Sequence, residues 1–395
     1  MVVAKLKPLS VSAKKLWKSK MKKVLFGSTI LTATVALSLS TSSIQAQEKA
    51  KPLQISVGGF FNSVIGFADQ SDSFENDTGT PGLEPGYDSF NIYNDSEIHF
   101  TGSTKLDNGI GVEVHVELEA DQVSAGVVDD SFMRLTGSFG DIRFGSTDAV
   151  TSVFANTAPA VGATGPNDGD VGNFIVKPSA VSATADTLLG TGNIMKVTYL
   201  TPTFNGFQAG FSFEPSDSDT NAMPVTKGDS GTDTTEYNVG LSYSGKMGTT
   251  TVAADISYKE DVGTDANSIT GIRGGISLGI GAFTIGGSFK DIDHAGTGIE
   301  GTSSSLEETG YDIGAQYDFG NTSVSATYLH SSMPLASGTT GDDEVQSLFL
   351  GASHNISPGV DLLGNVTWAE WKDEATTDAS NNQGFAVIGG VGITF

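Results

Sequence analysis

Residues 112–119, VEVHVELE, decide the fold of this chain. Apolar and polar side chains alternate through the stretch, with Val112, Val114, Val116 and Leu118 on one face and Glu113, His115, Glu117 and Glu119 on the other. Because successive side chains of a β-strand point to opposite faces, this period of two predicts a strand with one apolar and one polar face. Such a strand fits a soluble sandwich, or a barrel that turns its apolar face to lipid and its polar face to an aqueous interior.

The same alternation, followed outward in both directions, predicts sixteen strands. The predicted strands are residues 54–67, 92–104, 110–121, 130–137, 140–147, 194–201, 206–214, 235–244, 248–259, 268–279, 282–291, 309–318, 322–330, 345–356, 360–371 and 385–395. Repeated segments of about ten residues are typical of strands that cross a membrane.

The connections between these strands alternate in length. The short ones are residues 106–109, 137–140, 202–206, 245–248, 279–282, 319–321 and 357–359, and all carry residues that favour tight turns. The long ones are residues 68–91, 122–129, 148–193, 215–234, 260–267, 292–308, 331–344 and 372–384. Short turns on one rim and long polar loops on the other are expected of a membrane barrel, and an even number of strands lets the sheet close. A soluble adhesin sandwich has no reason for this alternation.

The composition limits the remaining choices. The chain has 50 glycines, no cysteine, and 46 acidic against 21 basic residues. The absence of cysteine excludes disulfide scaffolds, thiol catalysis and cysteine-ligated metals. Residues 47–395 hold no apolar run of about 18 residues, so only a closed barrel could cross a bilayer. We therefore predict an all-β fold, a transmembrane antiparallel β-barrel of sixteen strands.

The first 46 residues have the features of an export signal. They contain eight of the basic residues and no acidic one, and their removal leaves 13 basic and 46 acidic residues, a net charge of −33. Lys22 and Lys23 precede an apolar run from Val24 to Leu39 and then small residues up to Ala46. A membrane-anchoring helix is the alternative, but the run is short and rich in Ser and Thr. We predict cleavage after Ala46 and one barrel domain at 47–395.

The start of the chain leaves one point open. Residues 1–20 form a basic extension upstream of Met21. They are either an unusual basic start of the signal or the result of a start codon placed too early, with Met21 as the true first residue.

Three stretches resemble the general, non-specific porins of Gram-negative bacteria, of the sixteen-stranded trimeric type. They are SFMRLTGSFGDIRFGST at 131–147, FAVIGGVGITF at 385–395 and LQISVGGFFNSVIGF at 53–67. The resemblance implies a homotrimer in the outer membrane, in contact with lipid and lipopolysaccharide, that lets small hydrophilic solutes and ions diffuse passively through a water-filled channel. It also implies that the barrel-assembly machinery recognises the terminal strand through Phe395.

The hairpin at 131–147 carries two basic residues that we place in the pore. A turn centred between Ser138 and Phe139 sets Arg134 opposite Arg143, and their apolar neighbours belong on the outer face, so both arginines point inward. Porins of the resembled type often have an arginine where this chain has Ser146, so that pore arginine is not expected here.

The long loop that follows this hairpin supplies candidate partners for the arginines. The resemblance implies that this third loop folds into the lumen and narrows it, with loop carboxylates facing a basic patch on the wall. A loop of about 45 residues is too long for a simple connector. The candidate loop carboxylates at the constriction are Asp148, Asp168, Asp170 and Asp186.

The inward faces of the second and third strands are acidic. We predict that Glu97, His99, Glu113, His115, Glu117 and Glu119 line the wall of the lumen. An anionic lumen favours cations over anions. A substrate-specific channel stays the alternative, although a phosphate channel needs more basic residues and a sugar channel needs a row of inward aromatic rings.

Other functions find less support in the sequence. The five histidines, His99, His115, His294, His330 and His354, lie in no catalytic motif, so we do not expect an enzyme. Acidic clusters at 69–77, 217–220 and 339–344 offer oxygen ligands for calcium, but none matches the EF-hand pattern, and solvated loops that repel one another explain them better. We predict no other metal, no cofactor and no nucleic-acid partner.

Overall fold

The computed structural model describes residues 52–76, 84–121, 128–167, 171–190, 192–216, 234–262, 268–295, 306–334, 341–374 and 378–395. The chain divides into two compact units, Met1–Gln47 and Glu48–Phe395. The predicted export signal at 1–46 lies outside the described residues, so its cleavage after Ala46 stays a prediction.

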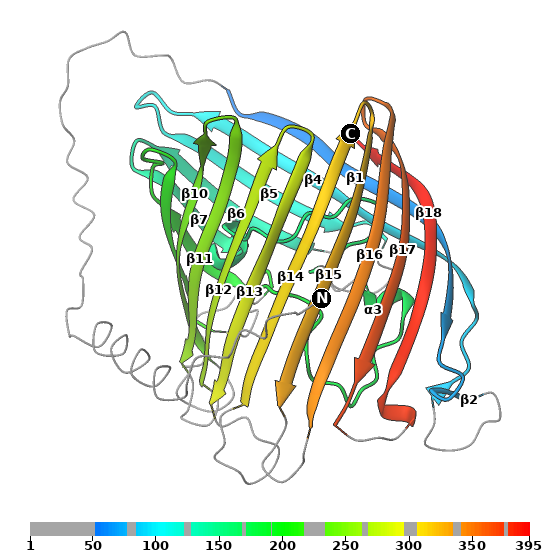
Figure 1. The fold of residues 1–395 in the computed structure, drawn as a ribbon. Helices are drawn as coiled ribbons and strands as arrows, with labels where there is room; N and C mark the ends of the chain where they lie inside the picture. Colours follow the sequence, from blue (N-terminus) through cyan, green and yellow to red (C-terminus); the bar gives the residue numbers. More distant parts are fainter. Residues whose placement is uncertain are drawn as a thin grey trace. The chain divides into compact units, whose positions relative to one another are not determined.

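Sixteen antiparallel strands form a closed barrel in the second unit (Figure 1), which confirms the predicted fold class. The strands are β1 Gln54–Gln70, β4 Phe90–Lys105, β5 Gly111–Glu119, β6 Val128–Gly137, β7 Gly140–Ser146, β8 Met195–Leu200, β9 Phe207–Glu214, β10 Thr235–Met247, β11 Thr250–Val262, β12 Ser268–Ile280, β13 Phe283–Ala295, β14 Leu306–Phe319, β15 Thr322–Pro334, β16 Asp342–Ser357, β17 Val360–Lys372 and β18 Asn382–Thr394. Smaller elements are the two-residue strands β2 Glu75–Asn76 and β3 Glu84–Pro85, the helices α2 Val150–Val153 and α3 Val171–Phe174, and the 3-10 turn Asp378–Ser380.

The barrel closes where the last strand meets the first. β18 pairs antiparallel with β1, with Phe60 opposite Thr394. The backbone amide of Gly59 donates to the carbonyl oxygen of Phe395 at 3.1 Å, and the Phe395 amide donates to the Gly59 carbonyl, also at 3.1 Å. The closure leaves no unpaired edge on either strand, so the sheet offers no template for aggregation there.

The two rims differ as the sequence predicts. Short turns and the C-terminus lie at the top of Figure 1, and the long connections lie at the opposite rim. Several strands extend further toward the long connections than predicted, with β13 reaching Ala295 and β16 beginning at Asp342. Their outer ends carry polar residues, which interrupt the alternation of the sequence while the ladder of hydrogen bonds continues beyond the apolar band.

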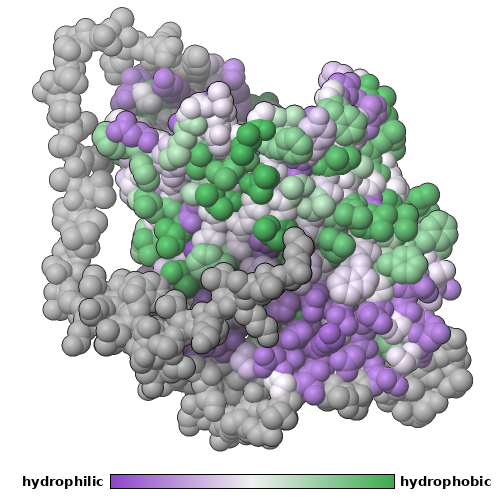
Figure 2. Space-filling view, viewed as in Figure 1, coloured by the Kyte–Doolittle hydropathy of each residue, from purple (hydrophilic) through white to green (hydrophobic). Residues whose placement is uncertain are grey.

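The outer surface carries the apolar side chains of the alternating pattern. Large hydrophobic residues are exposed on the outer face of the strands from β11 to β18, among them Ile256, Ile276, Ile285, Ile313, Leu350, Val366 and Val387. Figure 2 shows hydrophobic residues gathered over the middle and upper part of this face and hydrophilic ones toward the long connections. In the part of the chain that the structure describes, no helix is long and apolar enough to cross a membrane.

The connection between β7 and β8, which we call the third loop, folds into the barrel. Its residues Val171, Ile175, Val181 and Ala183 form one apolar cluster with inward-facing residues of three strands, namely Leu329, Met333, Val345, Phe349, Ala369 and Trp371. Figure 1 shows the short helix α3 of this loop within the ring of strands. The predicted inward-folded loop is confirmed, and its described part begins at Thr147 and ends at Ile194.

Candidate functional site

Partners across an antiparallel ladder share a face, so the register identifies the residues that line the lumen. Arg134 lies opposite Arg143, as predicted, and also opposite Glu113 on the other neighbouring strand. Met133 and Phe144, their sequence neighbours, are exposed on the outer surface. Both arginines therefore point into the barrel.

The two arginines are held by carboxylates of their own wall. Arg134 donates from Nε to Asp141 Oδ2 at 2.9 Å, and its NH1 lies 3.8 Å from Glu113 Oε1. Arg143 NH2 lies 3.7 Å from the same Asp141 oxygen, and its guanidinium lies 5.8 Å from the centre of the Phe132 ring. The sequence prediction did not single out Asp141, although its position two residues before Arg143 places it on the same face.

The loop aspartates take different positions. Asp148 lies close enough to Lys196 and Arg143 for both charges to lower its pKa, but burial is the stronger influence and raises that pKa above its usual range. Asp186 pairs with Lys290 at 3.2 Å and not with the two arginines. Asp168 and Asp170 lie outside the described residues, so their role at the constriction stays a prediction.

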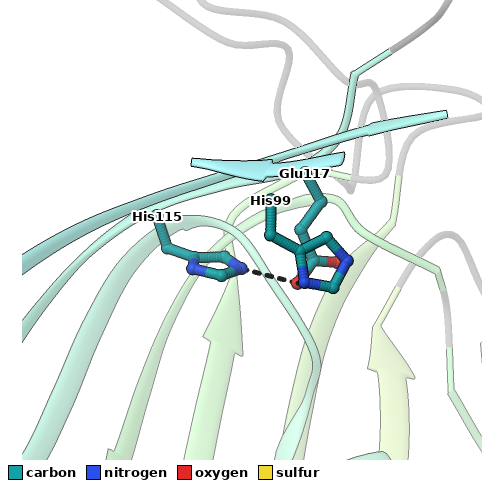
Figure 3. A group of neighbouring side chains, drawn as sticks. All are labelled: His99, His115 and Glu117. Atoms are coloured by element: carbon teal, nitrogen blue, oxygen red, sulfur yellow. Dashed lines mark hydrogen bonds and ion pairs between the residues drawn. The ribbon is translucent and has the colours of Figure 1, made fainter. Parts of the chain in front are cut away.

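The acidic residues predicted on β4 and β5 form a hydrogen-bonded group on the lumen side. Glu97 lies opposite Glu119, and His99 lies opposite Glu117. Figure 3 shows both histidine rings directed at Glu117, with His115 Nε2 at 2.6 Å from Glu117 Oε1. The second nitrogen of each ring has a partner, because His99 Nε2 lies 2.7 Å from Glu97 Oε2 and His115 Nδ1 lies 3.0 Å from a threonine hydroxyl.

We call the inward-facing group on β4–β7 the open wall. It consists of Glu97, His99, Glu113, His115, Glu117, Glu119, Arg134, Asp141 and Arg143. None of these nine has a hydrogen bond or ion pair with the described part of the third loop. The side chains of Arg134 and Glu113 are 35% and 30% exposed, so water reaches them inside the barrel.

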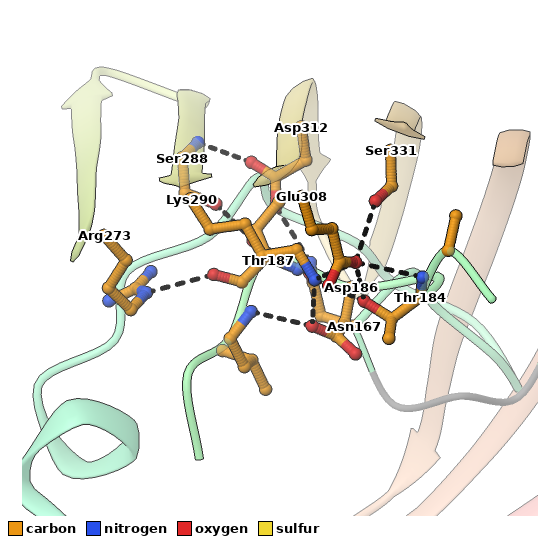
Figure 4. Close-up of polar contacts among 12 residues, drawn as sticks. Asn167, Thr184, Asp186, Thr187, Arg273, Ser288, Lys290, Glu308, Asp312 and Ser331 are labelled. Atoms are coloured by element: carbon orange, nitrogen blue, oxygen red, sulfur yellow. Dashed lines mark hydrogen bonds and ion pairs between the residues drawn. The ribbon is translucent and has the colours of Figure 1, made fainter. Parts of the chain in front are cut away.

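We call the inner faces of β8–β18, against which the third loop packs, the covered wall. Arg273 on β12 is fully buried there and forms an ion pair with Asp255. Arg273 also donates to the loop carbonyl oxygens of Thr187, at 3.2 Å, and Asn156, at 3.0 Å. The Asn156 amide in turn donates to Asp255 at 2.8 Å. The pair thus holds two separate turns of the loop, as the Thr187 contact in Figure 4 illustrates.

A second buried pair repeats this arrangement on the neighbouring strands. Lys290 on β13 lies 3.0 Å from Glu308 on β14, and both side chains are almost wholly buried. Glu308 accepts from the Thr184 amide at 3.0 Å and from the Thr184 hydroxyl at 2.7 Å. Ser331 also donates to Glu308, at 3.2 Å (Figure 4). A buried charge is stable only when it is paired and hydrogen-bonded. Here Lys290 and Glu308 pair with each other, and Thr184 of the loop donates the hydrogen bonds to Glu308.

Two more basic residues of the covered wall are buried in ion pairs. Lys196 lies 3.4 Å from Glu214 and donates to the Thr147 carbonyl at 2.8 Å, near the start of the loop. Lys259 lies 2.8 Å from Glu236 on the adjacent strand. Together with Arg273 and Lys290, these residues place four basic side chains beneath or beside the loop, where they do not meet the aqueous lumen.

Glycines on the covered wall let the loop backbone approach. A Cβ atom at Gly275 would lie 1.8 Å from the Asn156 carbonyl oxygen, and one at Gly351 would lie 1.6 Å from the Val161 carbonyl oxygen. Any side chain at either position would displace the loop. These inward glycines are a signal in the sequence that marks where another segment runs against the wall.

The predicted calcium clusters lie in the acidic connections between strands. Of the three predicted clusters, residues 217–220 lie outside the described residues, as does the beginning of 339–344. Asp343 lies near Asp373 and Glu374, with one carboxylate oxygen of each within 4.8 Å of the others. Calcium binding there stays a prediction.

Comparison with known proteins supports one reading of this geometry. The sequence model of the Gram-negative porin family matches residues 33–374. No curated protein sequence matches the chain.

Solved structures agree on the fold. An anion-selective porin from Comamonas acidovorans superposes with a TM-score of 0.58 at 18% identity, covering 87% of this chain and 100% of that one. A porin structure refined at 1.8 Å gives a TM-score of 0.59 at 18% identity, and it also covers 87% of this chain and 100% of that one. OmpT of Vibrio cholerae, an outer membrane protein in its trimer form, gives 0.56 at 12% identity, covering 88% of this chain and 100% of that one.

A closed barrel with an apolar outer surface and a charged, partly loop-filled interior defines a channel protein of the outer membrane and not an enzyme. The chain belongs to the Gram-negative porin family.

Proposed function

We propose that this porin is a general diffusion channel that favours cations over anions. The observation that carries the proposal is the unequal burial of its charges. Four basic residues of the covered wall, Lys196, Lys259, Arg273 and Lys290, are buried in ion pairs. On the open wall, in contrast, Glu97, Glu117 and Glu119 are partly exposed and pair with neither Arg134 nor Arg143.

The electrostatics of the remaining passage follow from this difference. A buried and paired charge contributes little to the potential in the lumen, because its partner cancels most of its field within a few ångströms. A partly solvated carboxylate with no lysine or arginine partner acts over about one Debye length, roughly 8 Å at physiological ionic strength. A passage beside the open wall therefore has a negative potential that concentrates cations.

The fold alone does not determine the sign of selectivity. One porin with the same fold is anion-selective by its name. The side chains on the lumen wall must decide, and in this chain the exposed ones are mostly acidic. A sugar-specific channel, the alternative, needs a row of inward aromatic rings, and the described part of β4–β7 turns only Tyr93 and Phe132 inward.

Trimeric assembly belongs to the same proposal. β7, β8 and β9 have seven, six and eight residues, fewer than the 9–11 that a strand needs to cross a membrane. A neighbouring copy that covers this short wall would shield it from lipid. OmpT is solved in a trimer form, which supports the same number of subunits here.

The reversal potential under a salt gradient tests the proposed selectivity. Purified protein comprising residues 47–395 is inserted into a planar bilayer between potassium chloride solutions of unequal concentration. We expect ohmic conductance in groups of three steps and a reversal potential of the sign that reports preferred passage of potassium. Preferred passage of chloride would contradict cation preference, and conductance in single steps would contradict the trimer.

A further inference from the structure

We propose that His99, His115 and Glu117 form a binding site for a divalent transition metal ion, with Zn²⁺ as the reference, on the open wall of the pore. Metal binding by these residues is independent of the proposed ion selectivity. The inference rests on the positions of their ring nitrogens and carboxylate, on the partners behind them, and on access from the lumen.

The three ligands converge from two adjacent strands. His99 is on β4, and His115 and Glu117 are on β5, where a spacing of two residues keeps both on the lumen face. One ligand atom of each residue lies within 4.8 Å of the others. Two imidazoles and one carboxylate form a set of ligands that zinc uses in proteins, with the fourth position left to water.

The distances fit a tetrahedral ion. Metal–ligand bonds of about 2.0–2.2 Å place neighbouring ligand atoms about 3.3 Å apart. Glu117 Oε1 lies 2.6 Å from His115 Nε2 and 3.9 Å from His99 Nδ1, values on either side of that separation. A small shift of the Glu117 side chain makes the two distances equal. The Glu117 side chain is 20% exposed, so a rotation about its torsion angles costs little free energy.

Each histidine is oriented by a second partner on its far nitrogen. His99 Nε2 donates to Glu97 at 2.7 Å, which leaves Nδ1 as the ligand atom. The Thr101 hydroxyl lies 3.0 Å from His115 Nδ1, so with a metal ion on Nε2 the Nδ1–H would donate to this hydroxyl. Metal-binding histidines in proteins almost always have such a carboxylate or oxygen partner, because it fixes the tautomer and increases the basicity of the ring.

The surroundings favour a cation and allow it to enter. Glu97, Glu119 and Asp129 bring three further carboxylates together within 4.8 Å beside the site. The histidine side chains are 30% and 16% exposed to the lumen, so an ion in the channel reaches them without unfolding the wall. This access distinguishes the group from the buried ion pairs of the covered wall.

Binding of Zn²⁺ and Co²⁺ to the purified, folded protein tests the proposal directly. We expect one ion per chain, and with Co²⁺ the visible absorption of a tetrahedral complex with nitrogen ligands. His115→Ala and His99→Ala should each weaken Zn²⁺ binding about 100-fold, and Thr101→Val, which removes only the partner of His115, about tenfold.

His354→Ala provides the matched control. His354 is exposed, lies on the outer face at the short-turn end of β16 and contacts Thr322, so its removal should leave Zn²⁺ affinity unchanged. Circular dichroism of every variant must show the folded barrel. Absence of binding by the wild-type protein, or equal affinity of the wild-type protein and His115→Ala, would overturn the proposal, and equal affinity would place the ion in the acidic loops.

The channel gives a second readout. An ion bound on the open wall replaces negative by positive charge there, so micromolar Zn²⁺ should reduce the preference for potassium, and a chelator should restore it. The change should be absent in His115→Ala. If the protein binds Zn²⁺ but does not conduct, the metal site stands and the channel proposal fails, so the two are tested separately.

Discussion

The open wall and the covered wall use the same residue types for opposite purposes. Arg273 and Asp255 on the covered wall are completely buried and bond to the third loop, whereas Arg134 and Glu113 on the open wall remain about one-third exposed. On the covered wall, the charged side chains fix the position of the third loop. On the open wall, the charged side chains are exposed to water in the lumen. The location of the loop, more than the number of charges, determines which residues act on a permeating ion.

The largest expected effect comes from breaking a buried pair on the covered wall. Asp255→Ala leaves Arg273 buried without its carboxylate, which should reduce the free energy of unfolding by about 3–5 kcal/mol. It also removes the acceptor of the Asn156 amide, so the loop should detach and the conductance should rise. Urea unfolding and single-channel recording measure the two effects.

The matched change on the open wall is Glu113→Ala. It removes one exposed partner of Arg134, while Asp141 remains, so the loss of stability should be at most about 1 kcal/mol. If the two variants lose equal stability, the distinction between the walls is wrong.

A methyl group placed between loop and wall should have the next largest effect. In Gly351→Ala, the new Cβ overlaps the Val161 carbonyl oxygen, so the loop must move, at a cost of about 1–3 kcal/mol. Gly66→Ala is the control, because its Cβ would meet Ile388 and Phe174 at ordinary contact distances of 3.5 and 3.7 Å. Conductance should change in the first variant and stay at the wild-type value in the second.

The sequence predicted the barrel well but not the division of its interior. All sixteen predicted strands are present, because alternation of apolar and polar residues is a local property. Lys290 and Arg273 were not singled out, since their burial depends on loop residues such as Thr184 and Thr187, far away in sequence. Their inward position, next to opposite charges and glycines on the same face, was the available signal.

Neutralising carboxylates on the open wall should change selectivity and leave stability alone. A unit charge about 8 Å from an ion in water contributes about 0.5 kcal/mol, favourable for a cation and unfavourable for an anion, so Glu119→Gln should reduce the cation-to-anion permeability ratio about fivefold. Arg134→Gln should shift the ratio in the opposite direction. Reversal potentials under one salt gradient compare both, and shifts of the same sign would contradict an electrostatic origin.

The smallest expected effect is a pH dependence of stability that arises from Glu374, just after β17 at the rim of the barrel. The hydrogen bond with Asp373, together with burial, raises the pKa of Glu374 to about 7. The folded chain thus keeps this proton up to about pH 7, while the unfolded chain releases it near pH 4.5. The contribution of Glu374 to stability is therefore present below pH 4.5 and is lost as the pH rises to about 7.

Glu374→Gln tests this dependence, because the amide does not titrate. The variant should lose less stability than the wild-type protein between pH 5 and pH 8 in urea unfolding. Equal losses would assign the dependence to other groups.

The loop contacts also determine an order of assembly. Asn365 donates to the Thr164 carbonyl across 201 positions of the chain, and Asn382 donates to the Val176 carbonyl across 206. Contacts this distant in sequence form only after the intervening chain is in place. These two contacts of the loop therefore form only after β17 and β18 have joined the sheet, and a chain stalled before β17 would have neither a closed barrel nor these two attachments of the loop.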